Sequence, residues 1–367
     1  MKENFVCGFI GLGLIGGSIA KAIRKVYPKC RLLAYDLNQN ALQSAVSDGV
    51  IDVPLSEISK DFSSCDYIFL CAPVSENDKN LPLIKKYISP ACILTDAGSV
   101  KTDIHRSIKE AGLENQFIGG HPMAGSERTG YLNSKALLLE NAYYILTPCN
   151  GVSENILADF EKLISSLGAI PLILTCTQHD YVTAAVSHLP HVIAASLVNL
   201  IKDSDSDDGI MKMIAAGGFK DITRIASSSP VMWQQICLTN NENILTLLDA
   251  YMEALSKIRR RIASSDSAKL YEFFDQARAY RDSFIGTSSG PIKKSYSVNI
   301  EIADEPGALA SIATILALHQ ISIKNIGITH NREQDDGVLK VEFYEESSIE
   351  QAVQILSAKG YTVYSRN

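Results

Sequence analysis

Residues 5–18 read FVCGFIGLGLIGGS, an apolar run typical of a strand that passes directly into a glycine-rich turn and the start of a helix. Gly11, Gly13 and Gly16 have the GxGxxG spacing of a dinucleotide-binding turn. In such a turn the first glycine permits the tight bend, the second admits a pyrophosphate, and the third lets helix and strand pack closely. The free N–H groups and positive dipole end of the helix would then face the phosphates. The stretch predicts a nucleotide-binding βα unit at the head of the chain.

A carboxylate follows at the place where the adenosine ribose of such a ligand would lie. Asp36 ends the next apolar run, 20 residues after Gly16, which is the spacing at which an acidic residue bonds the ribose hydroxyls. It would repel a 2′-phosphate, and Leu37 and Asn38 supply no arginine to hold one. We therefore expect NAD rather than NADP. The alternative is a glycine-rich turn with a surface aspartate beside it.

The first half of the chain alternates short apolar runs with amphipathic stretches. This alternation is typical of βαβ units and predicts a mostly parallel sheet of Rossmann type. The expected strands are residues 5–10, 32–35, 67–70, 92–95, 143–146 and 171–174, with helices such as 15–27 and 152–167 between them.

From about residue 177 onward, helix signals replace strand signals. Apolar residues recur at three- and four-residue spacing over residues 180–201, 232–264 and 268–281, and Thr177 with Asp180 resembles a capping pair for the first helix. A block of this kind cannot easily bury all its apolar stripes alone, so we expect it to form a dimer.

The last part of the chain is separated from the helical block by a linker and restarts as a small α+β unit. Residues 286–294 read GTSSGPIKK, a linker by composition. The expected domains are residues 1–175, 176–286 and 295–367.

Composition excludes several classes of protein. Hydrophobic residues make up 46% and charged residues 20% of the chain, which is ordinary for a globular protein. The net charge of −7 disfavours nucleic acid and anionic membranes as partners, since both require a basic surface. The eight cysteines have no CxxC pairs or metal-type spacing, so reduced thiols and no metal site are expected.

An apolar run over residues 6–20 behind Lys2 superficially suggests a signal peptide, but its glycines would weaken a signal helix. No other stretch approaches the roughly 20 apolar residues that a membrane span needs. The sequence therefore predicts a cytoplasmic protein.

Four further segments carry polar side chains that could perform chemistry. DAGSVK (96–101) follows an expected strand, so it lies at the carboxyl edge where such sheets bind ligands. GGHPMAGSE (119–127) places His121 in a glycine-rich loop shortly after another short strand. SHLPH (187–191) and GGFKDITRIASSSPVMW (217–233) come from the helical region.

Each of these segments also has a structural interpretation. His188 and His191 could pack on one helix face around Pro190, or be taken for metal ligands at i, i+3 with no third ligand in view. Arg224 could be an ordinary surface arginine, and Trp233 a core anchor.

Taken together and in this order, the segments resemble the prephenate dehydrogenase family, which includes arogenate and cyclohexadienyl dehydrogenases. The resemblance covers the whole chain, and DEPGALASIA (304–313) looks like part of an ACT domain, a small amino-acid-sensing module. The resemblance implies a Rossmann-type N-terminal domain, an all-α dimerisation domain and a ferredoxin-like C-terminal domain. It also implies NAD-dependent oxidative decarboxylation of prephenate to 4-hydroxyphenylpyruvate.

The resemblance assigns roles to individual residues. His121 would take the proton of the substrate's ring hydroxyl, Ser99 would link that histidine to the nicotinamide side, and Arg224 would grip a carboxylate with its planar fork. His191 would be a second histidine at the substrate, and Trp233 would reach the site from a partner subunit. The full substrate-binding set is Arg224, His191, His188, Asp221, Gly217, Trp233 and Glu127, and the cofactor-binding set is Gly11, Gly13, Leu14, Ile15, Gly16, Asp36, Ala72 and Pro73.

The ACT-like part implies feedback inhibition by tyrosine, with a structural dimerisation module that binds nothing as the alternative. Its expected ligand residues are Asp304, Pro306, Gly307, Ala308, Leu309, Asn325 and Ile326. For the whole chain, the alternatives are an arogenate dehydrogenase of the same family, another hydroxyacid dehydrogenase with a helical second domain, and an NAD-binding sensor without turnover. The presence of His121, Ser99 and Arg224 together argues against the sensor.

Overall fold

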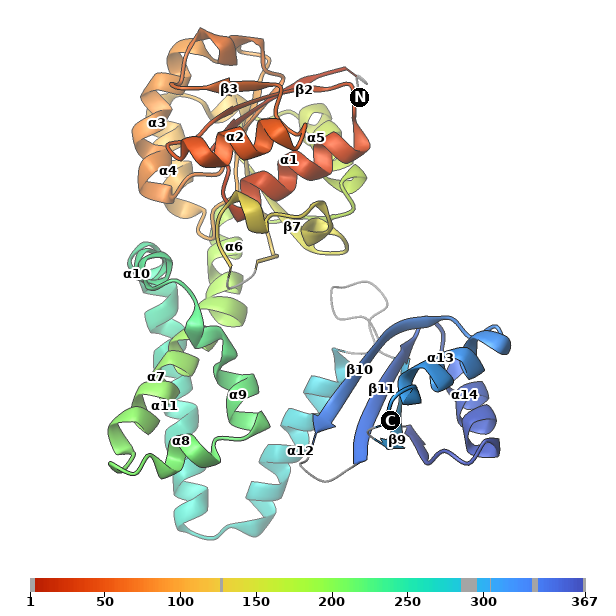
Figure 1. Cartoon of the computed structure of the whole chain (residues 1–367). Helices are drawn as coiled ribbons and strands as arrows, with labels where there is room; N and C mark the ends of the chain where they lie inside the picture. Colours follow the sequence, from red (N-terminus) through yellow and green to blue (C-terminus); the bar gives the residue numbers. More distant parts are fainter. Residues whose placement is uncertain (1–3, 126–127, 285–295, 304, 332–335, 366–367) are drawn as a thin grey trace. The chain divides into compact units, whose positions relative to one another are not determined.

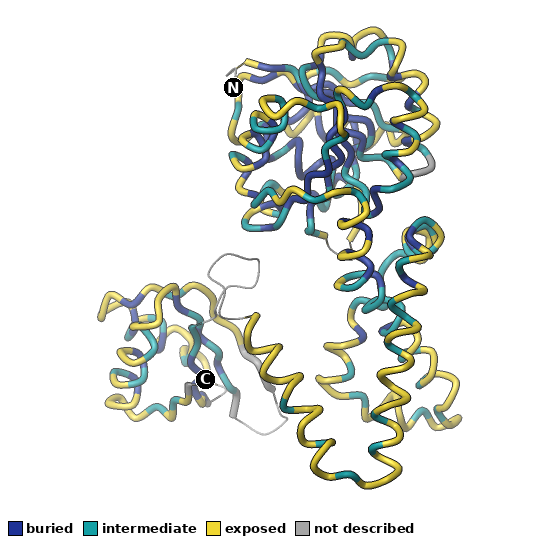
Figure 2. Tube along the Cα trace, turned by 180° about the vertical axis from the view of Figure 1, so that it is seen from behind, coloured by how far each residue is buried: buried dark blue, intermediate teal, exposed yellow. Residues whose placement is uncertain are grey.

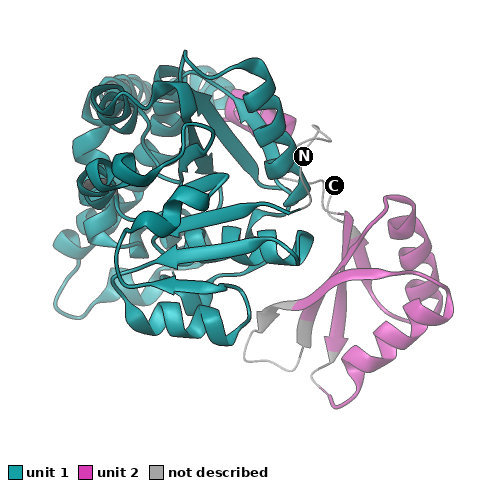
Figure 3. Ribbon diagram, turned by 90° about the horizontal axis from the view of Figure 1, so that it is seen from above, with its two compact units in different colours: residues 1–273 teal, residues 274–367 magenta. Residues whose placement is uncertain are grey.

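The structure is a computed structural model that describes residues 4–125, 128–284, 296–303, 305–331 and 336–365. It divides into two compact units, Met1–Phe273 and Phe274–Asn367 (Figure 3). Each unit is described by itself below.

The first unit begins with an eight-stranded sheet in the order β3-β2-β1-β4-β5-β6-β7-β8. All neighbouring strands are parallel except the antiparallel pair β6 and β7. The strand order reverses between β1 and β4, the point at which open α/β sheets bind ligands. The strands are β1 (Val6–Ile10), β2 (Arg31–Tyr35), β3 (Val53–Leu55), β4 (Tyr67–Leu70), β5 (Ile93–Asp96), β6 (Phe117–Pro122), β7 (Tyr143–Pro148) and β8 (Ile170–Ile173).

Helices cover both faces of this sheet (Figure 1), and the central strands are therefore buried on both sides. One face packs against α1, α2 and α5, where Phe9 stacks on Phe69 at 5.1 Å between ring centroids. The other face packs against α3 and α4. The helices are α1 (Leu14–Val26), α2 (Gln39–Ser47), α3 (Val74–Tyr87), α4 (Thr102–Ala111) and α5 (Glu154–Ser166), with short 3₁₀ turns η1 (Lys60–Ser64), η2 (Glu114–Gln116), η3 (Tyr131–Asn133) and η4 (Ala136–Leu139).

The rest of the first unit is helical, as expected, but its helices begin and end differently. The first begins at Cys176, because Thr175 and Gln178 form the capping box in place of the expected Thr177 and Asp180. The expected single helix over 232–264 is broken at Asn240, whose backbone leaves helical geometry. The elements are α6 (Cys176–Thr183), the π-helical turn η5 (Ala184–His188), α7 (Leu189–Ser204), α8 (Ile210–Ile214), α9 (Gly217–Thr223), η6 (Arg224–Ser227), α10 (Pro230–Thr239), α11 (Asn241–Ala263) and α12 (Ser267–Ser283). The boundary between the two units falls within α12.

Much of this helical part is exposed (Figure 2), and its exposed residues include many large apolar side chains. The continuous helix over Cys176–Ser204 is 29 residues long, with a mean hydropathy of 1.5 in its most apolar window and 17% of that window buried. By length and composition alone this helix is long and apolar enough to cross a membrane, which was not singled out from the sequence. The same helix carries the buried polar residues His179, Asp180 and His188, which bond to other elements of this unit.

The second unit is an antiparallel sheet in the order β10-β11-β9-β12 with two helices. Its core holds Ile300, Ile312, Leu316, Leu339 and Leu356, all fully buried. The elements are β9 (Tyr296–Ala303), α13 (Ala308–Leu318), β10 (Ile323–Asn331), β11 (Asp336–Phe343), α14 (Ser347–Ala358) and β12 (Val363–Ser365). The expected fold class, a Rossmann-type domain, a helical domain and a small ferredoxin-like domain, is confirmed, while the expected linker lies outside the described residues.

Candidate functional site

The glycine-rich turn after β1 forms a close-packed cradle at the point where the strand order reverses. Gly11 has φ +97°, and a Cβ there would lie 2.6 Å from the backbone nitrogen of Ala72. A Cβ on Gly16 would meet the carbonyl oxygen of Gly11, whereas one on Gly13 would meet nothing within 4 Å. Gly11 and Gly16 thus let the turn pack against the end of β4, and Gly13 leaves open space at the start of α1. This arrangement fits the pyrophosphate of a dinucleotide.

Asp36 closes this cradle at the end of β2. Its Oδ2 accepts a hydrogen bond of 2.5 Å from the Leu12 backbone, and its Oδ1 accepts one of 2.7 Å from Asn38. The carboxylate is therefore held against the glycine turn, and the neighbouring Leu37 is 77% exposed. The other expected cofactor residues lie at the same edge: Leu14 and Ile15 begin α1, and Ala72 and Pro73 follow β4.

A buried ion pair holds the DAGSVK turn against β6. Lys101 is fully buried and pairs with Asp96, and its Nζ also donates to the carbonyl oxygen of Gly120 at 2.8 Å. Asp96 in turn accepts hydrogen bonds from the backbones of Gly98 and Gly120 at 2.9 and 3.1 Å. Ser99 lies half-buried in this turn, and no hydrogen bond joins it to His121 among the described residues.

His121 lies inside β6 and not in a loop, which corrects the expectation from the sequence. It pairs with Ile145 of β7, so the strand continues through the two preceding glycines. A Cβ on Gly120 would lie 2.6 Å from the Asp96 carbonyl oxygen, and one on Gly119 would collide with Thr147. The glycines therefore serve close packing between strands, and they hold His121 on a rigid element.

Two residues that the sequence did not single out as site residues lie behind His121. The Nδ1 of His121 is 2.8 Å from Nε2 of His179, and Nδ1 of His179 is 2.8 Å from Oδ1 of Asp180. Asp180 also accepts hydrogen bonds from the backbones of Lys101 and Thr102, at 2.7 and 2.8 Å. The available signal was a His-Asp pair just after the last strand of the sheet.

The surroundings set the charge of these groups. Burial, followed by the charges of His179, Lys101 and His188, lowers the pKa of His121 well below its ordinary value. Burial also lowers the pKa of His179, although its hydrogen bond to Asp180 opposes this. For Asp180, burial alone would raise the pKa, but hydrogen bonds from His179, Thr102 and Lys101 together lower it. At neutral pH both histidines are neutral and the carboxylate is charged.

A second histidine pair lies on the π-helical turn and α7, around Trp233. His191 stacks on the indole at 3.7 Å between centroids, and His188 meets it edge-on at 6.0 Å. His188 is buried and lies 3.1 Å from the Asn240 amide through its Nδ1. Trp233 comes from α10 of the same chain, and its expected contribution to the site of a partner subunit stays a prediction.

Arg224 lies beside this cluster at the start of η6, which packs against α7. Its charge contributes to a lowered pKa of His191, after burial as the main cause. The structure thus brings together His188, His191, Trp233 and Arg224. Gly217 and Asp221 lie exposed on the neighbouring α9, and Glu127 lies outside the described residues.

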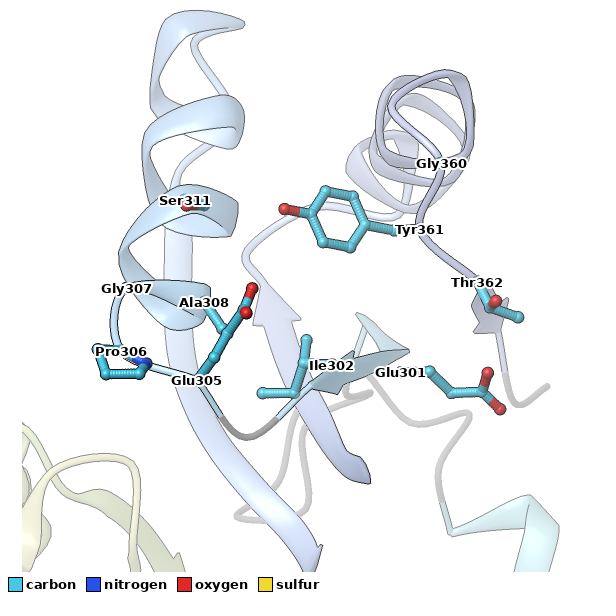
Figure 4. A pocket seen from close by; sticks show the side chains of 10 residues that line it. All are labelled: Glu301, Ile302, Glu305, Pro306, Gly307, Ala308, Ser311, Gly360, Tyr361 and Thr362. Carbon is cyan, nitrogen blue, oxygen red and sulfur yellow. The ribbon is translucent and has the colours of Figure 1, made fainter. Parts of the chain in front are cut away.

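The second unit has a cavity of about 260 Å³ between the start of α13 and the turn before β12 (Figure 4). Gly307 adopts φ 98° at the start of α13, and Tyr361 points toward that helix across the cavity. Of the expected ligand residues, Pro306, Gly307 and Ala308 line it; Leu309, Asn325 and Ile326 do not, and Asp304 lies outside the described residues. The lining residues are Glu301, Ile302, Glu305, Pro306, Gly307, Ala308, Ser311, Gly360, Tyr361 and Thr362.

All eight cysteines are free thiols in the structure. Burial raises the pKa of several of them, that of Cys65 to about 12, so they are not reactive thiolates at neutral pH. Within the described residues, no group of three or more His, Cys, Asp or Glu side chains could hold a metal ion.

Comparisons with known proteins agree with this architecture along the whole chain. Residues 19–172 match the family model of the prephenate dehydrogenase nucleotide-binding domain, residues 175–276 that of the prephenate dehydrogenase dimerization domain, and residues 296–360 that of the ACT domain. A prephenate dehydrogenase of Bacillus subtilis is 36% identical over 98% of this chain and 97% of its own length.

Solved structures give the same result. The prephenate dehydrogenase of A. aeolicus, in complex with hydroxyphenyl propionate and NAD+, is 31% identical with a TM-score of 0.72, over 76% of this chain and 98% of that one. The arogenate dehydrogenase of Synechocystis is 28% identical with a TM-score of 0.69, over 76% of this chain and 100% of that one. The chain matches the nucleotide-binding, dimerization and ACT domains in this order and is 36% identical to a curated relative over 98% of its length. It therefore belongs to the prephenate dehydrogenase family of NAD-dependent oxidoreductases.

Proposed function

We propose that the chain oxidises and decarboxylates prephenate to 4-hydroxyphenylpyruvate with NAD, as a step of tyrosine biosynthesis. The observation that carries the proposal is the position of His121, held on a strand at the ligand-binding edge of a nucleotide-binding sheet, where burial lowers its pKa. A neutral imidazole can accept a proton, and a lowered pKa keeps it in that form at neutral pH.

Prephenate carries a ring hydroxyl and two carboxylates, and the residues suit these groups. His121 accepts the hydroxyl proton as the ring carbon loses its hydride. NAD, when bound, supplies the acceptor for that hydride. The ring carboxylate leaves as carbon dioxide, and formation of the aromatic ring drives the reaction forward. Ser99, in the turn between Asp96 and Lys101, orients the reacting groups on the nicotinamide side.

The substrate carboxylates are bound by the helical part. Arg224 offers a planar, permanently charged fork that suits a carboxylate, and it lies beside His191. His188, Trp233, Gly217, Asp221 and Glu127 complete the proposed substrate-binding set. We assign this set to a domain of residues 176–286, between a nucleotide domain of residues 1–175 and a regulatory domain of residues 295–367.

We also propose that the enzyme works as a homodimer in the cytoplasm. Exposed apolar side chains along the helical part, including Val186, Leu200 and Ile214, support pairing with a second copy. Eight free thiols suit a reducing compartment.

Prephenate and arogenate are distinguished by assaying NADH formation with each substrate, with NAD or NADP. Arogenate differs only by an amino group in place of the side-chain keto group, and the likeness to an arogenate dehydrogenase favours testing it beside prephenate. Turnover of prephenate with NAD supports the proposal, and preference for arogenate reverses the substrate assignment. An absence of turnover with both would leave a non-catalytic sensor, or a dehydrogenase acting on a different acid, as the function.

The ACT domain is the proposed site of feedback inhibition by tyrosine. Its cavity at the start of α13 has the size of a small ligand and two glutamates, Glu301 and Glu305, in its wall. The test compares inhibition of the full chain with that of a chain ending near Gly290. Loss of inhibition in the shortened chain supports the proposal, and unchanged inhibition would move the tyrosine site into the catalytic body.

A further inference from the structure

Three side chains form a hydrogen-bonded line that runs from His121 into the protein interior. His179 and Asp180 are 0% and 1% exposed, and their ring nitrogens and carboxylate oxygens are all engaged by protein groups. They come from α6, the first helix of the helical part, and they contact His121 of β6 and the start of α4. The line ends on the Asp180 carboxylate, to which the proposed function assigns no role.

The hydrogen bonds determine where the protons lie. Ionised Asp180 can only accept, and it accepts from the backbones of Lys101 and Thr102 and from Nδ1 of His179. Nδ1 of His179 therefore carries a proton. In neutral His179 the other ring nitrogen, Nε2, is then bare and can only accept, so the proton shared with His121 belongs to Nδ1 of His121.

This assignment leaves Nε2 of His121 with a free lone pair. We propose that His179 and Asp180 are positioning residues that hold His121 in the tautomer whose Nε2 faces the substrate hydroxyl, and that they share the positive charge formed when it accepts the proton. The inference rests on the proposed function, in which His121 is the base.

The proton balance of the step is simple. The hydroxyl proton moves to Nε2 of His121 while the hydride leaves the ring carbon for NAD, so one positive charge appears on the imidazole. The Nδ1 proton of His121 can then shift toward Nε2 of His179, while the Nδ1 proton of His179 remains bonded to Asp180. The charge is thus placed between two histidines and one carboxylate, as in the histidine and aspartate of a serine protease triad.

Other charges around the line leave Asp180 as its counter-ion. Lys101 and His188 both disfavour a positive charge on His121, and Lys101 is itself paired with Asp96. Asp180 is the carboxylate bonded directly to the line. The buried Asp96 also acts on His179 through its charge, but Asp96 is paired with Lys101. Removing the charge of Asp180 should therefore make protonation of His121 less favourable.

The kinetic test uses Asp180→Asn and His179→Gln, with Tyr181→Phe as the matched control. Tyr181 is the next residue on α6 and is 49% exposed. We expect kcat to fall roughly 10²-fold in both variants. Removing a group that orients a metal-binding histidine costs ~10–100-fold, and removing the carboxylate of a serine protease triad costs ~10⁴-fold. NAD affinity, measured by calorimetry, should stay unchanged, and Tyr181→Phe should match the wild type.

The pH profile separates this role from a purely structural one. A negative charge favours the protonated imidazole, so its loss lowers the pKa of His121. The acid limb of kcat/KM should therefore move to lower pH in Asp180→Asn. A fall in kcat with no movement of this limb would overturn the proposed sharing of charge.

A second measurement needs neither turnover nor NAD. Nitrogen NMR of the wild-type chain with labelled histidines, with signals assigned through His121→Asn, reports which ring nitrogen carries the proton. We expect His121 and His179 to be protonated on Nδ1 and bare on Nε2. A proton on Nε2 of His121 overturns the inference. Because the wild-type chain is measured, this result does not depend on the folding of Asp180→Asn or His179→Gln. If the wild type turns over neither prephenate nor arogenate, the proposed function fails, while the tautomer result still decides the geometry of the line.

Discussion

Acid should destabilise the first unit through His188, and the size of the effect follows from its burial. His188 is 1% exposed, and burial lowers its pKa to about 4, with the charge of Asp180 only partly opposing this. In the unfolded chain the same histidine has a pKa of about 6.5. Between about pH 6.5 and pH 4 the unfolded chain therefore binds more protons than the folded chain. Stability is therefore present above about pH 6.5 and is lost as the pH falls toward 4.

The linkage relation gives this loss a magnitude. Between about pH 7.5 and pH 5, one histidine with these two pKa values removes about 2 kcal/mol of stability. His188→Asn removes the titrating group but keeps an oxygen that can accept the hydrogen bond from Asn240. Urea unfolding followed by circular dichroism across this pH range should show a loss about 2 kcal/mol smaller in the variant than in the wild type.

The control is His319→Asn, which removes an exposed histidine from the second unit and should leave the pH dependence of the wild type unchanged. An equal loss of stability in His188→Asn and the wild type would refute the reasoning, because the acid-sensitive group would then lie elsewhere.

Three further substitutions test the site. His121→Asn should lower turnover by ~10²–10⁴-fold with NAD affinity intact by calorimetry; near-normal turnover would remove His121 from the mechanism. Arg224→Gln should raise the KM for prephenate by ~10-fold or more, since a charged hydrogen bond is lost, and an effect on kcat alone would contradict a carboxylate grip. Lys101→Met leaves the Asp96 carboxylate buried and without its counter-ion, so urea unfolding should show about 3–5 kcal/mol less stability. Adding Asp96→Asn to this variant should recover part of the lost stability. A Lys101→Met variant as stable as the wild type would show that the ion pair contributes nothing.

The parts of the molecule that were predictable from the sequence are those determined by local pattern. The glycine spacing from Gly11 to Gly16 predicted the turn, and the alternation of apolar runs predicted the sheet and its class. The strand through His121 was missed because its two glycines resemble a loop, and only the neighbouring strands show why glycine is required there.

The unpredicted parts depend on contacts between distant segments. His121 and His179 are separated by 58 residues, and no periodicity indicates that their rings meet. Asn240 interrupts an otherwise continuous helical pattern because its side chain bonds both Asp180 and His188. The apolar length of the helix over Cys176–Ser204 was overlooked because His179, Asp180 and His188 interrupt the apolar run in the sequence.

The start of α4 has no capping side chain of its own, and Asp180 takes that place from a helix 78 residues further along the chain. The same carboxylate orients His179, so the seam between the sheet and the helical part passes through the proton line. A hinge motion that opened this seam would uncap α4 and withdraw the partner of His121 in one movement. In this fold, loss of the α4 cap and loss of the partner of His121 are therefore coupled through one carboxylate.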